Sequence, residues 1–509
     1  MQNHLRHRMK IGVIFILMWL IACTRPAPEA PTWQPSSPFV TFGPPTPISL
    51  ASLIPPTRAP GTPIVSPTPD IPHILPTPRH EEEQYIAQDG DTLGQIALDY
   101  GVSLKALMEA NQLTDADALS AGQVLIIPVP TPGPVGPGFK IIPNSELVFG
   151  PASITLDLRT FIEQKNGYLA SYQQEVDGEY LNAEQIITRV VQNYSVNPRF
   201  LLALIEHRSQ WVSNPNPDPT TLDYPLGFFD PPHAGLYRQL TWASNELNRG
   251  YYLWQVNALP TLALIDGSIV PVNASINAGT AGVENLFAQL DERAEWETDV
   301  TVSGLFQTYV SLFGYPFDLA IDPLIAPDLT QPPMQLPFES NDVWSFTGGP
   351  HAAWDSGSGW GALDFAPPGE AQGCVLSNAW IAAVANGLIV RAANNAVMQD
   401  LDGDGFEQTG WVVLYMHVED RDRVQPGTYL QAGKRIGHPS CEGGISNGTH
   451  VHIARRFNGE WIPADGNLPF ILDGWVSSGT GVEYDGYLTR GDQTIEAWDG
   501  KNDLNQIQR

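Results

Sequence analysis

The sequence predicts a multidomain protein whose last domain is β-rich and built on an antiparallel sheet. Its 509 residues exceed the usual size of one domain. Two linkers, a proline-rich one at 24–82 and a second at 130–153, separate parts with regular apolar patterns. Residues 83–129 read as a small βααβ unit, and residues 154–325 read as a mainly α domain. Short apolar segments that read as strands recur through residues 335–497.

Residues 1–23 have the pattern of an export signal. Three basic residues precede an apolar core at 11–21, which is too short to be a comfortable membrane span. The core ends in Leu-Ile-Ala-Cys23, which resembles the lipobox of bacterial lipoproteins. The resemblance implies cleavage before Cys23 and a diacylglycerol on its thiol, so we expect an exported protein that is lipid-anchored to the cell membrane or envelope. An ordinary secretory signal and an uncleaved anchor are the alternatives.

Charge and composition limit the partners of such a protein. The formal net charge of −29 argues against nucleic acid and against electrostatic capture by anionic wall polymers or lipids. The segment at 24–82 is rich in proline, threonine and serine, and we expect it to be an extended, semi-rigid tether. Attachment would therefore depend on lipid and on sugar-binding modules.

Residues 83–129 combine two strand patterns with two helix patterns. A strand at 85–87 and a closing strand at 122–128 enclose helices that open near Asp91 and Ser103. The unit strongly resembles a LysM domain, which implies binding of glycans that contain N-acetylglucosamine, and hence of peptidoglycan. A LysM fold that only packs or spaces is the alternative. The implied glycan-binding residues are Gly90, Asp91, Thr92, Asn111, Gln112 and Leu113.

Two segments of the helical region, 195–209 and 273–282, resemble the lysozyme-like lytic transglycosylases. In that family the catalytic acid is the glutamate immediately before a serine. Here Arg208 stands before the serine, and Glu206 lies two positions earlier. An arginine cannot protonate a glycosidic oxygen, so we expect the domain at 154–325 to be inactive. Action of Glu206 from a shifted register is the alternative.

Five residues with metal-ligand chemistry interrupt the apolar segments of the C-terminal domain. They are His351, Asp364, His417, His450 and His452. Imidazole and carboxylate are the usual ligands of a catalytic zinc, which takes three protein ligands and leaves a fourth position for water. Any one of these histidines alone is better explained as an ordinary surface or core residue, but the set favours a metal site.

Strand alternation predicts which way these side chains face. His450 and His452 share a face, while Val451 points into the core. Along 411–417 the same alternation separates two groups. Trp411, Val413, Tyr415 and His417 lie on one face, and Val412, Leu414 and Met416 lie on the other.

The set resembles that of the lysostaphin/LytM-type zinc endopeptidases, which cut peptidoglycan peptides. Most of that superfamily has a short His-x-x-x-Asp, but the position four before Asp364 is a tryptophan here. The β-lytic branch has a long separation after Gly-Gly-x-His, as at His351. The resemblance implies that His351, Asp364 and His452 bind Zn²⁺. It further implies that His450 acts on the water and His417 on the developing oxyanion.

We therefore expect a zinc-dependent endopeptidase that hydrolyses peptide bonds of peptidoglycan stems or cross-bridges and is targeted to the wall by LysM. Zinc lowers the pKa of water to about 7 and polarises the scissile carbonyl. His450 would take the proton of the water and return it to the leaving amine. A non-catalytic glycan-binding lipoprotein and an activator of other cell-wall hydrolases are the alternatives.

Cysteines and acidic residues of the C-terminal domain support two further predictions. If Cys23 carries lipid, Cys374 and Cys441 remain as an even pair in an exported domain, which favours a disulfide. The stretch at 400–405 resembles the start of an EF-hand loop, but a tryptophan stands where the loop needs glutamate. An acidic turn and a looser Ca²⁺ site at Asp400, Asp402 and Asp404 are both left open. Residues 498–509 are expected to form a tail.

Overall fold

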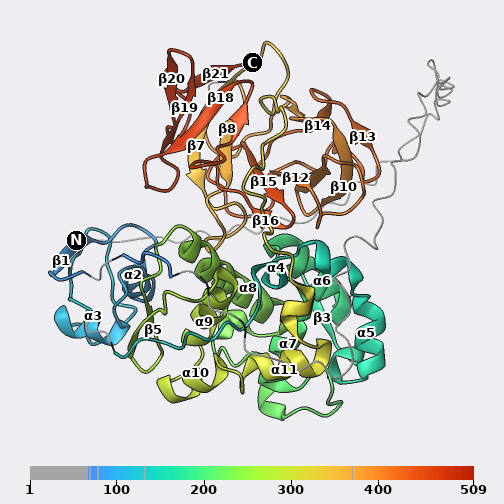
Figure 1. Ribbon diagram of the computed structural model, residues 1–509. Coiled ribbons are helices and arrows are strands. Elements are labelled where there is room, and N and C mark those ends of the chain that lie inside the picture. Colours follow the sequence, from blue (N-terminus) through green and yellow to red (C-terminus); the bar gives the residue numbers. More distant parts are fainter. Residues whose placement is uncertain (1–66, 68–69, 71, 77–78, 131–132, 370) are drawn as a thin grey trace, which may run out of the picture. The chain divides into compact units, whose positions relative to one another are not determined.

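The structure is a computed structural model that describes residues 67, 70, 72–76, 79–130, 133–369 and 371–509 (Figure 1). These residues all belong to one compact unit, Thr46–Arg509. The predicted export signal, Cys23 and most of the tether lie outside the described residues. In the described part of the chain, no helix is both long enough and apolar enough to cross a membrane.

The N-terminal unit has the predicted βααβ order. Strands β1 (Glu83–Ile86) and β2 (Val124–Ile127) pair antiparallel, and α2 (Leu93–Asp99) and α3 (Leu104–Ala110) lie between them in the sequence. The Ser103 hydroxyl caps the N-terminus of α3. Helices this short are not stable alone, so a common core has to hold them. That core contains Leu93, Ile96, Ala97, Val102, Leu107, Leu125 and Ile127.

The region that follows is mainly helical, as predicted. Asn182 and Gln185 form a capping box at the start of α6, and Asn197 caps α7 ahead of a proline at its first position. Residues 200–205 of α7 are completely buried, so α7 lies in the centre of this region. The helices are α5 (Leu158–Lys165), α6 (Ala183–Tyr194), α7 (Pro198–Ser209), α8 (Leu236–Gln255), α9 (Ala278–Ala288), α10 (Arg293–Asp299) and α11 (Leu305–Phe313).

Short elements complete the helical region. Two hairpins and five 3-10 turns connect the helices within the described residues. The hairpins are β3 (Gln173–Val176) with β4 (Glu179–Asn182), and β5 (Thr261–Ala263) with β6 (Ile269–Pro271). The turns are η1 (Pro151–Thr155), η2 (Tyr168–Ser171), η3 (Pro219–Thr221), η4 (Pro231–His233) and η5 (Pro316–Leu319).

The segment at 130–153 is not the open linker that its composition predicts. It contains α4 (Asn144–Leu147), in which Glu146 is fully buried. The Glu146 carboxylate lies 3.4 Å from Arg199 and accepts a hydrogen bond of 2.6 Å from the Tyr309 hydroxyl. Both partners are distant in sequence, so no local pattern could reveal that this segment belongs to the helical core.

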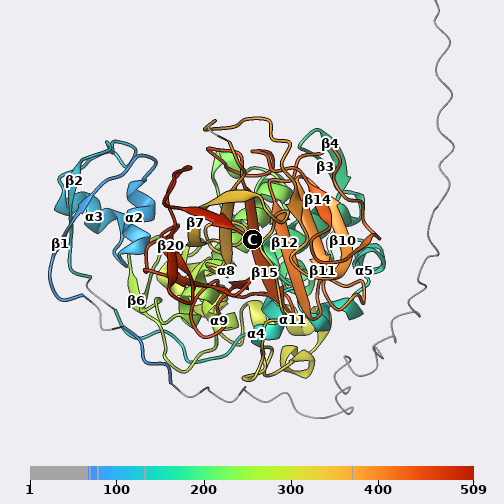
Figure 2. The same ribbon diagram turned by 90° about the horizontal axis from the view of Figure 1, so that it is seen from above.

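The C-terminal domain is organised around one antiparallel sheet, whose central strands lie side by side in Figure 2. The strand order is β13-β10-β11-β12-β15-β8-β7-β21, and β16 pairs with β15. The strands are β7 (Val343–His351), β8 (Ala362–Ala366), β10 (Gly387–Ala393), β11 (Ala396–Asp400), β12 (Trp411–Met416), β13 (Tyr429–Leu430), β15 (Val451–Phe457), β16 (Glu460–Trp461) and β21 (Gln506–Gln508).

Two smaller sheets are formed by segments that lie between strands of the main sheet in the sequence. One joins β17 (Ile471–Leu472), β18 (Trp475–Gly479), β19 (Gly486–Arg490) and β20 (Gln493–Glu496), and the other joins β9 (Ile381–Ala382) to β14 (Arg435–Gly437). The expected tail at 498–509 is not a tail, because β21 pairs with β7 and Ile507 is buried. Only the non-local pairing with β7 makes these residues a strand.

The predicted alternation of β12 is confirmed. Val413 and Tyr415 belong to a core within the C-terminal domain. Val412, Leu414 and Met416 belong instead to the core that contains the helical region. The helical region therefore packs on one face of the main sheet, and both faces of β12 are buried.

Charged groups are buried at this contact and compensate one another. Glu407 accepts hydrogen bonds from Arg391 at 2.7 Å and from Arg456 at 2.6 Å. The same guanidinium groups reach across to the helical region, where Arg391 donates to Asn193 at 2.9 Å and Arg456 donates to Ser195 at 3.1 Å. Burial of these charges is tolerated because each is paired and hydrogen-bonded.

Candidate metal centre

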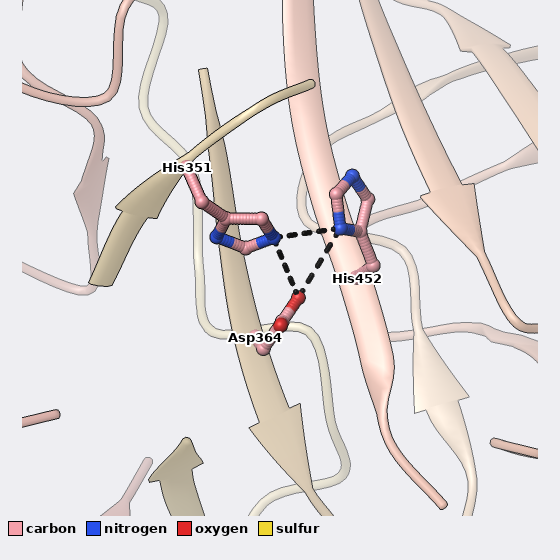
Figure 3. A group of neighbouring side chains, drawn as sticks. All are labelled: His351, Asp364 and His452. Carbon is pink, nitrogen blue, oxygen red and sulfur yellow. Dashed lines mark hydrogen bonds and ion pairs between the residues drawn. The ribbon is translucent and has the colours of Figure 1, made fainter. Parts of the chain in front are cut away.

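Strand register brings His351, Asp364 and His452 together (Figure 3). His452 in β15 stands opposite Asp364 in β8, and His351 ends the neighbouring strand β7. Asp364 Oδ1 lies 3.3 Å from His351 Nε2 and 3.2 Å from His452 Nδ1, and the two nitrogens are 3.0 Å apart. All three residues are buried.

The outward-facing nitrogen of each ring is held by a backbone carbonyl. His351 Nδ1 lies 2.8 Å from the oxygen of Gly349, and His452 Nε2 lies 3.0 Å from the oxygen of Ala353. A carbonyl can only accept, so these nitrogens carry the proton of the neutral rings and the facing nitrogens are acceptors. Asp364 Oδ1 has no hydrogen-bond donor either. Three acceptors thus converge on one point, which is unfavourable unless a cation lies among them.

The donor set and its spacing fit zinc. Ligand atoms at about 2.0–2.1 Å from a tetrahedral zinc lie about 3.3 Å apart, close to the three separations found here. The pKa shifts of the cluster also indicate a site for a cation. Burial lowers the pKa of His351, but the Asp364 carboxylate outweighs it, so the pKa of His351 lies above its ordinary value. Burial likewise raises the pKa of Asp364, but His351 and His450 bring it well below its ordinary value. The cluster therefore favours positive charge.

His450 lies beside these three residues. Its Nε2 is 3.6 Å from Asp364 Oδ2, and its Nδ1 is 2.7 Å from the oxygen of Gly448. The neutral ring therefore carries its proton on Nδ1 and turns an acceptor nitrogen toward the triad. This is the geometry that a general base needs.

His417 also enters the site, but strand alternation does not place it there. Strand β12 ends at Met416, and His417 has a left-handed φ of 63°, which takes it out of the face shared by Val413 and Tyr415. Its ring lies 4.4 Å from that of His450, and its Nδ1 is 2.9 Å from the oxygen of Glu442. Burial, with a contribution from His450, lowers the pKa of His417 to about 3.

An open cleft of about 930 Å³ surrounds the five predicted residues. Tyr484 forms part of its wall and was not predicted. The Tyr484 ring stacks on His351 at 4.2 Å, and its φ of 66° is unusual for an aromatic residue. The only sequence signal is its place in a glycine-bounded turn at 481–486. Other lining residues are apolar Ile445 and Trp498, acidic Glu483, Asp485 and Asp499, and basic Lys501.

The long segment between His351 and Asp364 is held by the helical region. The Tyr194 hydroxyl donates to Asp355 at 3.0 Å, and Asn245 accepts a hydrogen bond of 2.7 Å from the backbone N–H of Gly357. This segment includes Ala353, whose carbonyl orients His452. Residues of the helical region thus support the ligand His452 indirectly, through the segment that contains Ala353.

The predicted disulfide is present. Cys374 and Cys441 are bonded, and they join two segments that border the cleft. Asp400, Asp402 and Asp404 bring carboxylate oxygens within 4.8 Å of one another. Asp400 accepts from the backbone N–H groups of Gly403 and Gly405, so the turn supplies its own donors. A Ca²⁺ site there stays a prediction.

The comparisons with known proteins match both the N-terminal unit and the helical region. Residues 85–128 match the family model described as LysM domain, and residues 140–325 match the one described as LasA, N-terminal domain. Protease LasA of Pseudomonas aeruginosa strain UCBPP-PA14 is 24% identical over 290 residues, and LasA of strain PAO1 is equally similar. The match covers 54% of this chain and 66% of those relatives.

Solved structures align with smaller parts of the chain. Pseudoalterin, described as an M23 metalloprotease from the deep sea, is 23% identical with a TM-score of 0.29, covering 36% of this chain and 99% of its own. The catalytic domain of lysostaphin from Staphylococcus simulans is 24% identical with a TM-score of 0.18, covering 24% and 90%. The chain is thus similar to LasA and to an M23 metalloprotease, and the LysM match at 85–128 precedes the C-terminal domain in the sequence.

Several side chains predicted for the LysM groove serve the fold of that domain. Asp91 accepts hydrogen bonds from the Tyr85 hydroxyl and from the backbone of Gln88. Asn111 exchanges two hydrogen bonds with the backbone of Ile126. Thr92 caps the start of α2, Gln112 has a left-handed φ, and Gly90 lies in the turn before Asp91. Leu113 packs against the small core. Glycan recognition by this set stays a prediction.

The predicted loss of the transglycosylase acid has a structural counterpart. Arg208 donates to Asp291 at 2.8 Å and to the carbonyl of Leu226. The Glu206 carboxylate accepts hydrogen bonds from the backbone of Val212 and from the backbone and hydroxyl of Ser213. Both side chains are thus engaged in hydrogen bonds within the helical region. The lysozyme-like resemblance itself stays a prediction, because the family model that matches this region is the LasA one.

Proposed function

We propose that this chain is a zinc-dependent endopeptidase that hydrolyses peptide bonds of peptidoglycan stems or cross-bridges. One observation carries the proposal. Three acceptor atoms, of His351, Asp364 and His452, converge at the spacing of zinc ligands in an open cleft, with His450 beside them. The LysM match supports the wall as the location of the substrate, and the LasA relatives support proteolysis.

Three residues of the site would bind the metal, and His450 would transfer the proton. Zinc, when bound by His351 Nε2, Asp364 Oδ1 and His452 Nδ1, supplies a Lewis acid and lowers the pKa of water to about 7. His450 accepts the proton of the attacking water at Nε2, because its Nδ1 is committed to Gly448. The charged ring keeps that bond, and it then protonates the leaving amine.

His417 has a more restricted part than the family resemblance implies. The single proton of its neutral ring lies on Nδ1, facing the carbonyl of Glu442. Its Nε2 is then an acceptor and cannot donate to an oxyanion. His417 would therefore donate to a tetrahedral intermediate only after taking up a second proton, which its lowered pKa opposes.

Location and targeting belong to the same proposal. The LysM domain would hold the enzyme on glycan strands, and a lipid on Cys23 would keep it at the outer side of the membrane. The helical domain would be inactive as a glycosidase, because Arg208 and Glu206 are both engaged in structural hydrogen bonds.

The test is release of amines from purified peptidoglycan by the full chain. We expect new amine ends in the presence of zinc, none after chelation, and recovery when zinc is restored. His452→Ala should abolish release. The matched control is His438→Ala, which also removes a buried imidazole bonded to a carbonyl but lies outside the triad.

Two outcomes would replace this function. If the wild-type chain binds the glycan and releases no amines with zinc present, a glycan-binding lipoprotein is the better description. If His452→Ala still stimulates a separate wall hydrolase as well as wild type does, the chain is an activator.

A further inference from the structure

All four imidazoles of the site are oriented by backbone carbonyls, but the carbonyls come from two places. Those that orient the ligands His351 and His452 belong to residue 349, near the end of β7, and to residue 353, just after that strand. Those that orient His417 and His450 belong to residues 442 and 448. The two histidines that do not bind the metal, His417 and His450, thus depend on one loop, 441–448, and the metal ligands do not.

This loop is fastened at both ends to the same neighbouring segment. At its start, Cys441 is bonded to Cys374, and the sulfur of Cys374 lies 4.0 Å from the carbonyl of Ser446. After its end, Thr449 donates from its backbone to Gly373 at 3.0 Å, and its hydroxyl exchanges hydrogen bonds with the backbone of Val375 at 2.6 and 2.8 Å.

Between these ends the loop has little rigidity of its own. Gly443 and Gly444 have φ values of 77° and 93°, and the Ile445 side chain is fully exposed. Glycines in the left-handed region are the most flexible points of a chain. Its geometry therefore depends on its attachments.

We propose that the Cys374–Cys441 disulfide is a positioning element for catalysis, which holds loop 441–448 so that His417 and His450 both keep their proton on Nδ1. The role rests on the proposed peptidase function, but the tautomers can be observed without it. Glu442 follows Cys441 directly and is also held by the Ser440 hydroxyl at 3.0 Å and by Asn395 at 2.6 Å, whereas Gly448 lies at the far end of the loop and is secured through Thr449. Loss of the disulfide therefore disturbs His417 more than His450.

The primary test compares the wild-type chain with Cys374→Ser/Cys441→Ser. Serine is preferable to reduction because free thiols would bind zinc. The ¹⁵N spectra of histidine-labelled full chain report which ring nitrogen carries the proton, and His417→Gln and His450→Gln assign the two signals among the 11 histidines. We expect Nδ1–H at both rings in wild type, and a mixture at His417 in the double variant.

Zinc content and kinetics distinguish a loss of histidine positioning from a loss of the fold or of the metal site. The double variant should still bind one zinc per chain, because the carbonyls that orient His351 and His452 lie outside the loop. Its kcat should fall roughly 10- to 100-fold with KM little changed; loss of the correct histidine tautomer costs about 10⁴-fold in the Ser-His-Asp triad. Ile507→Ala, which opens a cavity in the far strand β21, is the control for lost stability and should leave the tautomers unchanged.

A second variant covers failure of the double variant to fold. Gly444→Ala keeps the disulfide but strains the loop 3.7 Å from the His417 ring, and it should shift the His417 tautomer in the same way. The inference is overturned if either wild-type ring carries its proton on Nε2, or if a folded double variant keeps the wild-type tautomers. Absence of peptidase activity in wild type would remove the proposed function and leave the tautomer result standing.

Discussion

Zinc should stabilise the wild-type chain strongly, and His452→Ala should remove that stabilisation. A ligand that binds only the folded state contributes RT ln(1 + [L]/Kd) to the free energy of unfolding. With free zinc buffered at 1,000 times the wild-type Kd, that amounts to about 4 kcal/mol. The triad is buried and converges only when β7, β8 and β15 are in register, so the unfolded chain offers no equivalent site.

The variant retains two of the three ligand groups. Loss of one ligand should weaken zinc binding by at least about 1,000-fold, more than the 10- to 100-fold typical when a residue that only orients a ligand is changed. The zinc-dependent gain then falls below about 1 kcal/mol. Without zinc, removal of His452 relieves the repulsion among three acceptors and leaves a cavity, so its cost should be about 1–3 kcal/mol.

The assay is urea unfolding with buffered zinc and with chelator. His438→Ala serves as the comparison, because His438 is equally buried and has its own carbonyl partner. It should lower stability by the same amount in both conditions and keep the zinc-dependent gain. Equal stabilisation of His452→Ala and wild type by zinc, or no stabilisation of wild type, would contradict a zinc site at His351, Asp364 and His452.

Three further predictions concern residues outside the metal centre. Glu407→Gln leaves Arg391 and Arg456 without their counter-charge and should lower the free energy of unfolding by about 3–5 kcal/mol, measured with urea. Burial without any partner raises the pKa of Glu284 well above its ordinary value. The folded state then binds this proton more tightly than the unfolded state, so wild-type stability falls by about 1.4 kcal/mol per pH unit between the two pKa values as pH rises. Glu284→Gln should abolish that fall between pH 5 and 7.5, and an unchanged slope would contradict it. Asn245→Ala frees the segment that carries the carbonyl for His452, so zinc affinity by calorimetry should drop about 10- to 100-fold.

The predictable part of the site is the part that has a side-chain signal. Imidazole and carboxylate in strand-like segments singled out five residues, and the family resemblance implied that three of them, His351, Asp364 and His452, bind the metal. Alternation placed Val412 and Val413 on opposite faces of β12. In the folded chain the segments that carry the three ligands are neighbouring strands, so pairing of β7 with β8 and of β8 with β15 brings the ligands together. The types of side chain were more informative about the metal site than the spacing between them.

The remaining features depend on backbone groups and long-range pairs. The carbonyls that set the four tautomers have no sequence signal, since every residue has one. His417 could not be placed by alternation because its left-handed φ lies beyond the end of the strand. The segments at 130–153 and 498–509 looked unstructured because their partners, Arg199 for Glu146 and β7 for β21, are far away in the chain.

The shared core between the helical region and the sheet has a consequence for protease-nicked or truncated forms. A single cut within 326–334 would separate the two parts covalently, yet the halves should still co-elute until denaturant is added. A shortened chain that begins near 335 would instead expose the apolar face of β12 to water. Such a fragment should adhere to surfaces and precipitate, so the helical region keeps the C-terminal domain soluble by covering this apolar face.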